Sequence, residues 1–259
     1  MTSPRIVVIT GATSGLGRAL AQLHLAKGDV VIAASRSAAG LDERTAMTGQ
    51  QTNMHPYSLD VGDPDAVVHF AAWVQERFGR CDFLYNNAGT AVFKPLVQME
   101  TAELDSTLQT NIAGVIHTTR AFLPMMLAAR CGRIINIASL AGRVATAKAS
   151  VYAASKAAVL RFSEGLRQEL AGTGIFVTCA LPGPIDTPFL DRADQTGEYR
   201  NKVQNHLLTP EQTAEKICRA AEKKRPEVAL PKTLAILSVL YTLFPHRLKQ
   251  LISPLINRK

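Results

Sequence analysis

Tyr152 and Lys156 are the residues whose types and spacing point most directly to a reaction. They stand four positions apart in a segment of helical pattern, and a helix places residues at this spacing on one face. A cation beside a phenol favours the phenolate, so a group that ordinarily titrates near pH ~10 can exchange a proton at lower pH. Of the five tyrosines, only Tyr152 has a lysine four residues later. The pair is a candidate acid/base device, with an exposed amphipathic helix face as the plainer alternative.

A glycine-rich turn near the N-terminus is a candidate phosphate site. The apolar, β-branched run from Arg5 to Thr10 precedes it, and apolar residues at helical spacing follow it up to Gly28. Glycine allows positive φ and has no Cβ, so the N–H groups at the helix start can approach a pyrophosphate. The spacing G-x-x-x-G-x-G differs from the usual dinucleotide fingerprint, and an isolated turn of this kind would be a tight bend. In this context we expect dinucleotide contacts from Gly11, Thr13, Ser14, Gly15, Leu16 and Gly17.

The end of the second apolar run, residues 29–35, indicates which dinucleotide binds. A cofactor with a free ribose 2′-hydroxyl would call for a carboxylate there. The chain has Ser35, Arg36 and Ser37 instead, and the next acidic residue is Asp42. A guanidinium and hydroxyl groups suit a 2′-phosphate, so we expect NADP(H) to be preferred over NAD(H), with Ser35 and Arg36 in contact. The alternative is that Arg36 is a solvated loop charge.

Length and composition favour one large domain. The chain has 259 residues, of which 47% are hydrophobic and 19% are charged. Its four cysteines and six histidines show no metal-ligand spacing, so we expect free, buried thiols in a reducing compartment and no metal. An apolar strand begins at Arg5, which leaves too little sequence for a signal peptide and predicts a cytoplasmic protein.

Strand and helix patterns alternate along the rest of the chain. The strands are expected at 82–86, 133–138, 175–181 and 227–230, and the helices at 64–78, 101–129, 151–170 and 211–224. Thr101, followed by Glu103 and Asp105, is the expected start of the longest helix, with the Thr101 hydroxyl as its cap. The alternation predicts an α/β, Rossmann-type doubly wound fold with a seven-stranded parallel sheet. Ligands bind such sheets at the carboxyl ends of the strands, where the glycine turn and Arg36 fall.

Several motifs occur in a fixed order along residues 5 to about 231. They are Thr10–Gly17, Asp60-Val61, Asn86–Gly89, Tyr152 with Lys156, and Pro182–Thr187. In this order the chain resembles the single-domain form of the short-chain dehydrogenase/reductase family, and we take residues 1–231 as an NADP-binding catalytic domain. The resemblance implies further dinucleotide contacts from Asp60, Val61, Asn87, Ala88, Gly89, Tyr152, Lys156, Pro182, Gly183, Ile185 and Thr187.

The resemblance also implies a catalytic tetrad of Asn111, Ser139, Tyr152 and Lys156. During reduction, negative charge grows on the carbonyl oxygen, which needs a hydrogen-bond donor and a proton. Tyr152 would give the proton, and Ser139 would hold the oxygen. Lys156 would bind the ribose and lower the pKa of Tyr152, and Asn111 would order a water that leads protons in from solvent. Taken alone, Ser139 could simply close a turn and Asn111 could satisfy a bent helix.

Apolar residues near the motifs favour a lipophilic substrate. They are Phe93, Leu140, Ala141, Val144, Ala145, Phe189 and Leu190. These residues would line a mostly apolar pocket, or they belong to the core and merely lie nearby. The polar segment 191–205, which contains Gly197, is a candidate mobile flap over the substrate.

Residues 232–259 form an apolar, basic C-terminal extension. Pro231 to Lys259 contains five lysines or arginines and no acid, so it carries +5 of the net charge of +8. The apolar run from Leu234 to Phe244 is too short for a bilayer span of ~20 residues. Such an extension can lie on an anionic membrane surface, pack against a second subunit or cover the pocket. Beyond Pro245, one helical face would hold Leu248, Leu251, Ile252, Leu255 and Ile256.

These features predict an NADP(H)-dependent oxidoreductase acting on a lipophilic carbonyl/alcohol pair, such as a ketone, a steroid-like compound or an acyl chain. We expect a homodimer or homotetramer. Sugar-nucleotide epimerases share the glycine turn and the Tyr/Lys pair but usually add a larger C-terminal domain. A nucleotide sensor or scaffold without turnover is the other alternative, although a sensor would not need both Ser139 and Tyr152. Residues 1–230 show no basic stripe interleaved with aromatics, so nucleic acid is not an expected partner.

Overall fold

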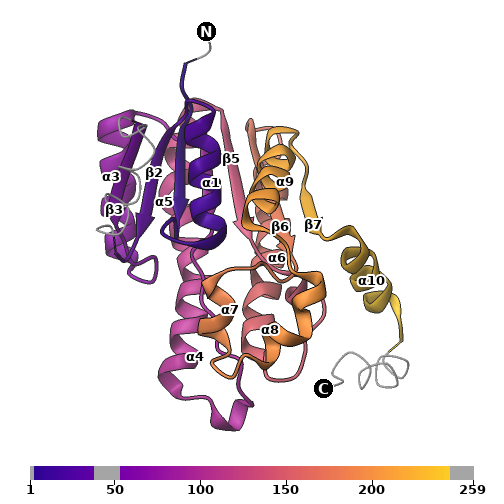
Figure 1. Ribbon diagram of the computed structural model, residues 1–259. Coiled ribbons are helices and arrows are strands. Elements are labelled where there is room, and N and C mark those ends of the chain that lie inside the picture. Colours follow the sequence, from indigo (N-terminus) through magenta and orange to yellow (C-terminus); the bar gives the residue numbers. More distant parts are fainter. Residues whose placement is uncertain (1–2, 38–52, 246–259) are drawn as a thin grey trace.

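Seven parallel strands form one sheet through the middle of the molecule (Figure 1). The computed structural model describes residues 3–37 and 53–245. The strand order is β3-β2-β1-β4-β5-β6-β7, which confirms the prediction of a doubly wound α/β fold. The strands are β1 (Ile6–Thr10), β2 (Val30–Ser35), β3 (Met54–Ser58), β4 (Phe83–Asn86), β5 (Gly132–Ile137), β6 (Ile175–Pro182) and β7 (Glu227–Leu230).

Helices cover both faces of this sheet (Figure 1). Successive strand residues point to opposite faces, so Val7 and Val8 belong to two different apolar clusters. The cluster around Val7 packs on α1 (Gly15–Ala26) and α9 (Pro210–Glu222). The cluster around Val8 packs on α3 (Pro64–Phe78), α5 (Gly114–Ala129) and α6 (Ser150–Glu169). The other described α-helices are α4 (Thr101–Leu108), α7 (Pro188–Ala193), α8 (Glu198–Val203) and α10 (Lys232–Leu243).

Strand β3 is the one strand for which the sequence predicts no position. It lies at the edge of the sheet, its residues Met54–Ser58 are half-buried or exposed, and Pro56 interrupts them. An edge strand needs neither a continuous apolar run nor an N–H at every position. The apolar run that identifies a central strand, as in β1, is therefore missing here.

The helix expected over 101–129 is present but changes its winding midway. A π-helical turn, Gln109–Ala113, joins α4 to α5. The predicted Thr101 cap was wrong, because Glu100 is the cap and forms a reciprocal capping box with Glu103. Within the described residues, only Thr101–Ala129 is long and apolar enough to cross a membrane. Its inner face belongs to the core, since Phe122 and Met126 are fully buried.

The four cysteines are all free thiols, but not all are buried. Cys81, Cys179 and Cys218 are buried, whereas Cys131 is exposed in the turn before β5. The expectation of four buried thiols was wrong at Cys131, because that turn lies at the surface. Among the described residues, no group of three potential ligands is arranged to hold a metal ion.

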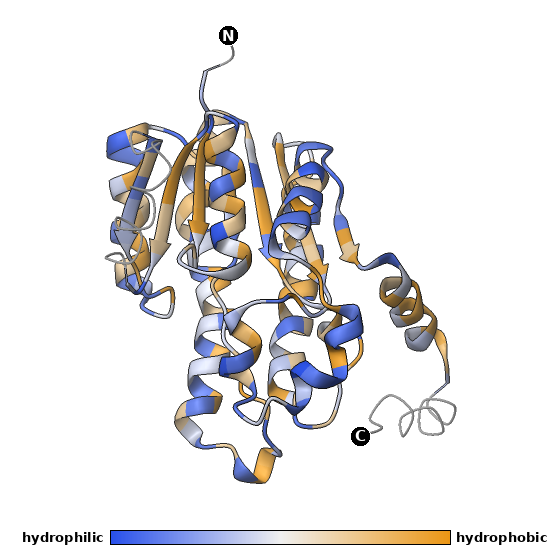
Figure 2. Ribbon diagram, in the orientation of Figure 1, coloured by the Kyte–Doolittle hydropathy of each residue, from blue (hydrophilic) through white to orange (hydrophobic). Residues whose placement is uncertain are grey.

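Helix α10 follows β7 and lies at the outer edge of the molecule (Figure 1). Its residues are hydrophobic around much of its circumference, as the colouring in Figure 2 shows. The amphipathic face expected beyond Pro245, with Leu248, Leu251, Ile252, Leu255 and Ile256, lies outside the described residues.

Candidate active site

One large cavity opens at the carboxyl ends of the strands, where the topology predicts a ligand. Its volume is about 1450 Å³. The structure brings every predicted dinucleotide contact to its walls: Gly11, Thr13, Ser14, Gly15, Leu16, Gly17, Ser35, Arg36, Asp60, Val61, Asn87, Ala88, Gly89, Tyr152, Lys156, Pro182, Gly183, Ile185 and Thr187. Ser139 lies there too, whereas Asn111 does not.

The glycine turn brings backbone close to backbone. Gly11 and Gly15 have φ of 67° and 52°, a region that favours glycine. A Cβ on Gly17 would lie 2.2 Å from the Gly11 carbonyl oxygen and 2.5 Å from Asn87 Nδ2. No side chain therefore fits at position 17, and the start of α1 stays open to the cavity.

The N-terminus of α1 is free to bind an anion. Its cap, Ser14, makes no side-chain hydrogen bond to the helix, and the first turn holds no acidic residue. By contrast, the caps of α3 and α9, Asp63 and Thr209, accept hydrogen bonds from their own helices. Unpartnered N–H groups and a positive dipole end suit a phosphate, so the turn fits the dinucleotide expected from the sequence.

Thr10 is a positioning residue, a role that the motif Thr10–Gly17 did not itself assign. Its Oγ1 accepts hydrogen bonds of 3.0 Å from both Asn87 N and Ala88 N. Asn87 Nδ2 in turn donates to the carbonyl oxygens of Thr10, at 2.9 Å, and Gly11, at 3.1 Å. The ends of β1 and β4 are thus fixed together. The signal was present in the motif Thr10–Gly17, whose first residue carries the hydroxyl.

The residues expected to select the cofactor, Ser35 and Arg36, lie at the end of β2. Ser35 is buried, and its Oγ donates to the Ser37 carbonyl oxygen at 3.0 Å. Arg36 is exposed at the end of β2, and its side chain makes no ion pair with another described residue. Asp60 Oδ1 accepts from Gly62 N at 2.8 Å. A guanidinium next to the cavity remains available for an anionic group.

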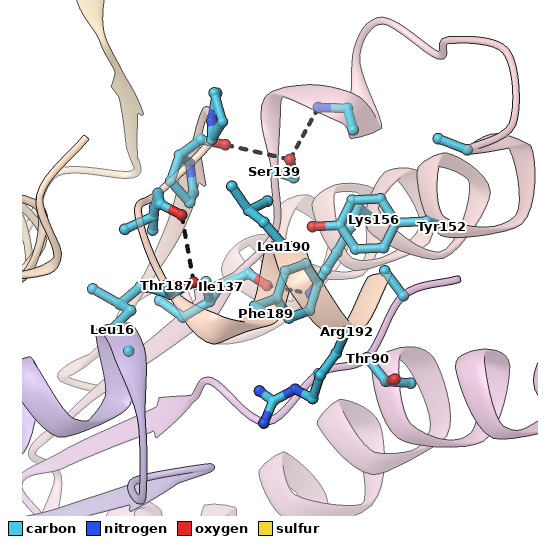
Figure 3. A pocket seen from close by; sticks show the side chains of 18 of the residues that line it. Leu16, Thr90, Ile137, Ser139, Tyr152, Lys156, Thr187, Phe189, Leu190 and Arg192 are labelled. Carbon is cyan, nitrogen blue, oxygen red and sulfur yellow. Dashed lines mark hydrogen bonds between the residues drawn. The ribbon is translucent and has the colours of Figure 1, made fainter. Parts of the chain in front are cut away.

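Helix α6 and the end of β5 bring Tyr152, Lys156 and Ser139 to one wall (Figure 3). Lys156 Nζ donates to the Ile137 carbonyl oxygen at 2.9 Å and lies 5.8 Å from the centre of the Tyr152 ring. Ser139 Oγ accepts from Ala141 N at 3.1 Å and donates to the Pro182 carbonyl oxygen at 3.3 Å. Figure 3 shows the Tyr152 hydroxyl directed into the pocket on the side of Ser139.

The pKa of Tyr152 departs from the sequence-based expectation. Burial raises this pKa above the ordinary value for a phenol, and hydrogen bonding to Ser139 only partly opposes the rise. Burial also lowers the pKa of Lys156 to about 8, so this lysine is itself readily neutralised. Lys156 is not among the groups that lower the pKa of Tyr152, so the expected lowering is not found. The cause is the desolvation of both groups.

Asn111 lies behind the cavity wall, in the π-helical turn, and is fully buried. Its Nδ2 donates to the Thr90 carbonyl oxygen at 2.8 Å and to Ser155 Oγ at 3.0 Å. Its Oδ1 accepts from Thr90 N at 2.8 Å. Asn111 thus connects the loop after β4 to helix α6. Thr90 and Ser155 are positioning residues without a sequence motif of their own, so only the structure identifies them.

Two aromatic side chains in the cavity wall lie close to the Tyr152 ring. The ring centres of Phe93 and Phe189 lie 5.8 Å and 5.9 Å from that of Tyr152. Tyr199, which the sequence analysis did not single out, lies 4.7 Å from Phe93. The predicted apolar residues that line the cavity are Phe93, Leu140, Ala141, Val144, Phe189 and Leu190, and Ala145 does not line it.

The segment expected to be a polar flap forms part of the same wall. It contains the second half of α7 and all of α8, and Arg200 forms ion pairs with Asp186 at 2.6 Å and with Asp191 at 2.8 Å. Phe93 N donates to the Ala193 carbonyl oxygen at 2.8 Å, which ties the segment to the loop after β4. From the far side, α10 adds Leu234, Leu237, Ser238 and Tyr241 to the cavity lining.

Comparisons with known proteins agree with this arrangement. The sequence profile described as short chain dehydrogenase matches residues 5–198. An uncharacterized oxidoreductase of Staphylococcus aureus is 34% identical over 216 residues, which are 83% of this chain and 90% of the relative.

Two solved structures share the fold. A short-chain dehydrogenase from Streptomyces avermitilis superimposes with a TM-score of 0.82 at 30% identity, covering 96% of this chain and 95% of its own. A serine dehydrogenase in closed form, complexed with NADP+, gives a TM-score of 0.80 at 33% identity, covering 88% of this chain and 95% of its own. With its cavity, its sheet and its profile in agreement, the chain belongs to the short-chain dehydrogenase family of oxidoreductases.

Proposed function

We propose that this protein is an NADP(H)-dependent oxidoreductase that interconverts a lipophilic carbonyl compound and its alcohol. The observation that carries the proposal is the position of the Tyr152 hydroxyl. It lies between a cradle suited to a dinucleotide and an apolar space bounded by Phe93 and Phe189. A proton donor is therefore available where a carbonyl carbon would meet the cofactor.

The roles of the protein side chains follow from this placement. When bound, the nicotinamide supplies or accepts the hydride. In the direction of reduction, Tyr152 gives its proton to the carbonyl oxygen, and Ser139 donates a hydrogen bond to that oxygen. Lys156 binds the ribose hydroxyls from its buried position beside Ile137. Asn111 keeps α6 and the loop after β4 in register through its hydrogen bonds to Ser155 and Thr90.

The preference for NADP(H) rests on Arg36 at the end of β2. Its exposed guanidinium lines the cavity in place of a carboxylate, and such a group pairs well with a 2′-phosphate. The serine dehydrogenase with 33% identity, complexed with NADP+, supports the same choice.

NADPH should bind this protein at least ~10-fold more tightly than NADH, because only NADPH offers a 2′-phosphate to Arg36. Titration of nicotinamide fluorescence with each cofactor measures the two dissociation constants. In Arg36→Gln the difference should shrink while NADH binding stays unchanged. Equal or tighter binding of NADH by the wild type would contradict the proposed preference.

Tyr152→Phe should reduce turnover by about 100-fold or more and leave NADPH binding within about a factor of two, because only the proton-donating oxygen is lost. NADPH oxidation against aldehydes, ketones, steroids and acyl thioesters measures turnover, and the fluorescence titration measures binding. Tyr57→Phe, which removes a hydroxyl outside the cavity, is the matched control. Retained turnover in Tyr152→Phe would mean that the proton comes from elsewhere.

The alternative of a sensor or scaffold without turnover has a distinct signature. Such a protein would bind the dinucleotide tightly and oxidise no NADPH against any member of the carbonyl panel.

We also propose a homodimer or homotetramer, supported by exposed apolar residues Leu108, Ile116 and Leu127 along α4 and α5. A solution mass of 28.0 kDa, that of one chain, would exclude an oligomer.

A further inference from the structure

Helix α10 carries two apolar stripes. The first consists of Leu234, Leu237, Ser238 and Tyr241, which follow the spacing i, i+3, i+4, i+7 and line the cavity. Leu234 and Ala235 pack on the apolar cluster that contains Leu140, and Ser238 is buried. This side of α10 therefore contacts the body of the protein through Leu234, Ala235 and Ser238 and forms part of the pocket wall, while Leu237 is 59% exposed.

The second stripe consists of Ile236, Val239, Leu240 and Leu243. It repeats the same spacing two residues later, which is a rotation of about 200° on an α-helix, so it lies almost opposite the first stripe. None of the four side chains lines the cavity, and their exposed fractions are 61%, 43%, 47% and 74%. We call these four residues the outer stripe.

The outer stripe is unusual for this molecule. Twelve large apolar residues of the described part of the chain are exposed, and six of them lie between Ile236 and Phe244. The other six are spread over α3, α4, α5 and the turn at Leu96–Gln98. A helix that is apolar on both sides is normally buried on both sides, in a protein core or in lipid. The outer stripe of α10 is therefore a candidate contact surface for lipid or for another protein.

The charge of the C-terminal sequence indicates which kind of surface would complement the outer stripe. Residues 231–259 contain Lys232, Arg247, Lys249, Arg258 and Lys259 and no acid, a sum of +5. An apolar stripe in a segment of basic sequence complements an anionic membrane surface. A helix of 12 residues is about 18 Å long, which is too short to cross the hydrocarbon layer of ~30 Å but suited to lying in its surface.

We propose that the outer stripe of α10 lies in an anionic membrane surface and that lipophilic substrates pass from that surface, along α10, into the pocket. The same short helix would contact lipid with one side and the substrate space with the other, through Leu237 and Tyr241. This inference rests on the proposed function for its substrate class, an apolar carbonyl or alcohol dissolved in lipid. Membrane contact itself does not depend on turnover.

Co-sedimentation with vesicles of phosphatidylglycerol and phosphatidylcholine in about equal parts tests the contact. The double variant Leu240→Glu, Leu243→Glu should bind these vesicles at least ~10-fold more weakly than the wild type, because both charges fall on the outer stripe. Val68→Glu with Val97→Glu is the matched control, since both valines are exposed apolar residues elsewhere, at 60% and 93%. The control should bind as the wild type does. Vesicles of phosphatidylcholine alone, or added salt, should weaken wild-type binding.

Two further measurements separate the alternatives. Equal sedimentation of the wild type and the double variant would overturn the proposal. A larger wild-type mass in light scattering that the double variant loses would also overturn it, because a second copy would then cover the stripe.

Turnover gives the last distinction. The double variant should reduce a short, water-soluble ketone as fast as the wild type does, and a long-chain ketone in vesicles at least several-fold more slowly. Equal rates on the vesicle-borne ketone would overturn the proposed passage of substrate. If no carbonyl is reduced by any form, the proposed function fails, while the sedimentation result still decides the membrane contact.

Discussion

The protonation state of Tyr152 determines how the two directions of the reaction depend on pH. Burial between Phe93 and Phe189 raises the pKa of Tyr152 above its ordinary value, so the phenol keeps its proton at neutral pH. Reduction of the carbonyl needs this protonated form, which is the predominant form at neutral pH. Oxidation of the alcohol needs the phenolate, so its rate should rise with pH over the range in which the phenol loses its proton.

Ser139→Ala should move the rising limb of the pH profile for alcohol oxidation to higher pH and lower kcat by about 100-fold. The reason is that hydrogen bonding to Ser139 lowers the pKa of Tyr152, so its removal leaves the effect of burial less opposed. Initial rates measured across a pH series give both quantities. Ser150→Ala, an exposed serine at the start of α6, is the control. An unshifted limb in Ser139→Ala would show that this hydroxyl does not influence the titrating group.

At the scale of elements, the sequence predicts those helices and strands whose own residues carry a strong helix or strand signal. The spans of α3 and β1 agree closely with expectation, because a proline-led amphipathic helix and a buried apolar strand each have a strong signal of their own. β3 was not located, because an edge strand gains its stability from pairing with β2 rather than from an apolar run. A cover over the pocket was one of three alternatives for residues 232–259, and the sequence could not choose among them, since the choice depends on where β7 ends in space.

The site divides in the same way. Its motif residues could be named from the sequence because each motif has characteristic residues at fixed spacing. Thr90 and Ser155 hold Asn111 through hydrogen bonds between segments that are distant in the sequence. Such contacts have no characteristic residue spacing, so they cannot be predicted from a motif. The raised pKa of Tyr152 was missed for a related reason, because burial is a property of the folded chain.

Gly17→Ala should weaken NADPH binding by at least ~10-fold, because the new Cβ would collide with the Gly11 carbonyl oxygen and force the turn apart from α1. Gly165→Ala in α6 is a close control, since a Cβ there would have no neighbour within 4 Å. Its helix should gain up to about 1 kcal/mol. Fluorescence titration and thermal unfolding of both variants provide the comparison. Wild-type affinity in Gly17→Ala would mean that the turn does not cradle the cofactor.

Across the whole molecule, the two ends of the sheet have different tasks. The cavity occupies the carboxyl ends of the strands, whereas a buried ionic network occupies the opposite end. There Arg5 binds Asp29 through two hydrogen bonds of 2.8 and 2.7 Å, and His24 Nδ1 donates to Asp29 at 2.7 Å. His24 Nε2 lies 2.9 Å from the Tyr85 hydroxyl. The network joins β1, α1, β2 and β4 away from the chemistry.

Asp29→Asn should destabilise the fold by about 3 kcal/mol, because it leaves Arg5 and the buried His24 without their carboxylate. Hydrogen bonds from His24 and Arg5 outweigh burial and hold the pKa of Asp29 well below its usual range. The carboxylate therefore stabilises the wild type fully above pH ~4, its value in the unfolded chain, and progressively less as the pH falls below that.

Urea unfolding at a series of pH values measures this effect. The loss of stability below pH ~4 should be smaller in Asp29→Asn than in the wild type. Asp105→Asn, at an exposed position in α4, is the control and should unfold as the wild type does. Equal acid sensitivity of wild type and Asp29→Asn would assign the loss to other groups.

The exposed thiol in the turn before β5 makes the protein convenient for single-molecule work. Cys131 is the one accessible cysteine of the four, and it lies at the amino end of its strand, while the cavity opens at the carboxyl ends. A maleimide dye should therefore attach at one defined position without cysteine-free mutagenesis and without blocking the pocket. Energy transfer from that dye to labelled vesicles would report the distance between the body of the protein and the bilayer.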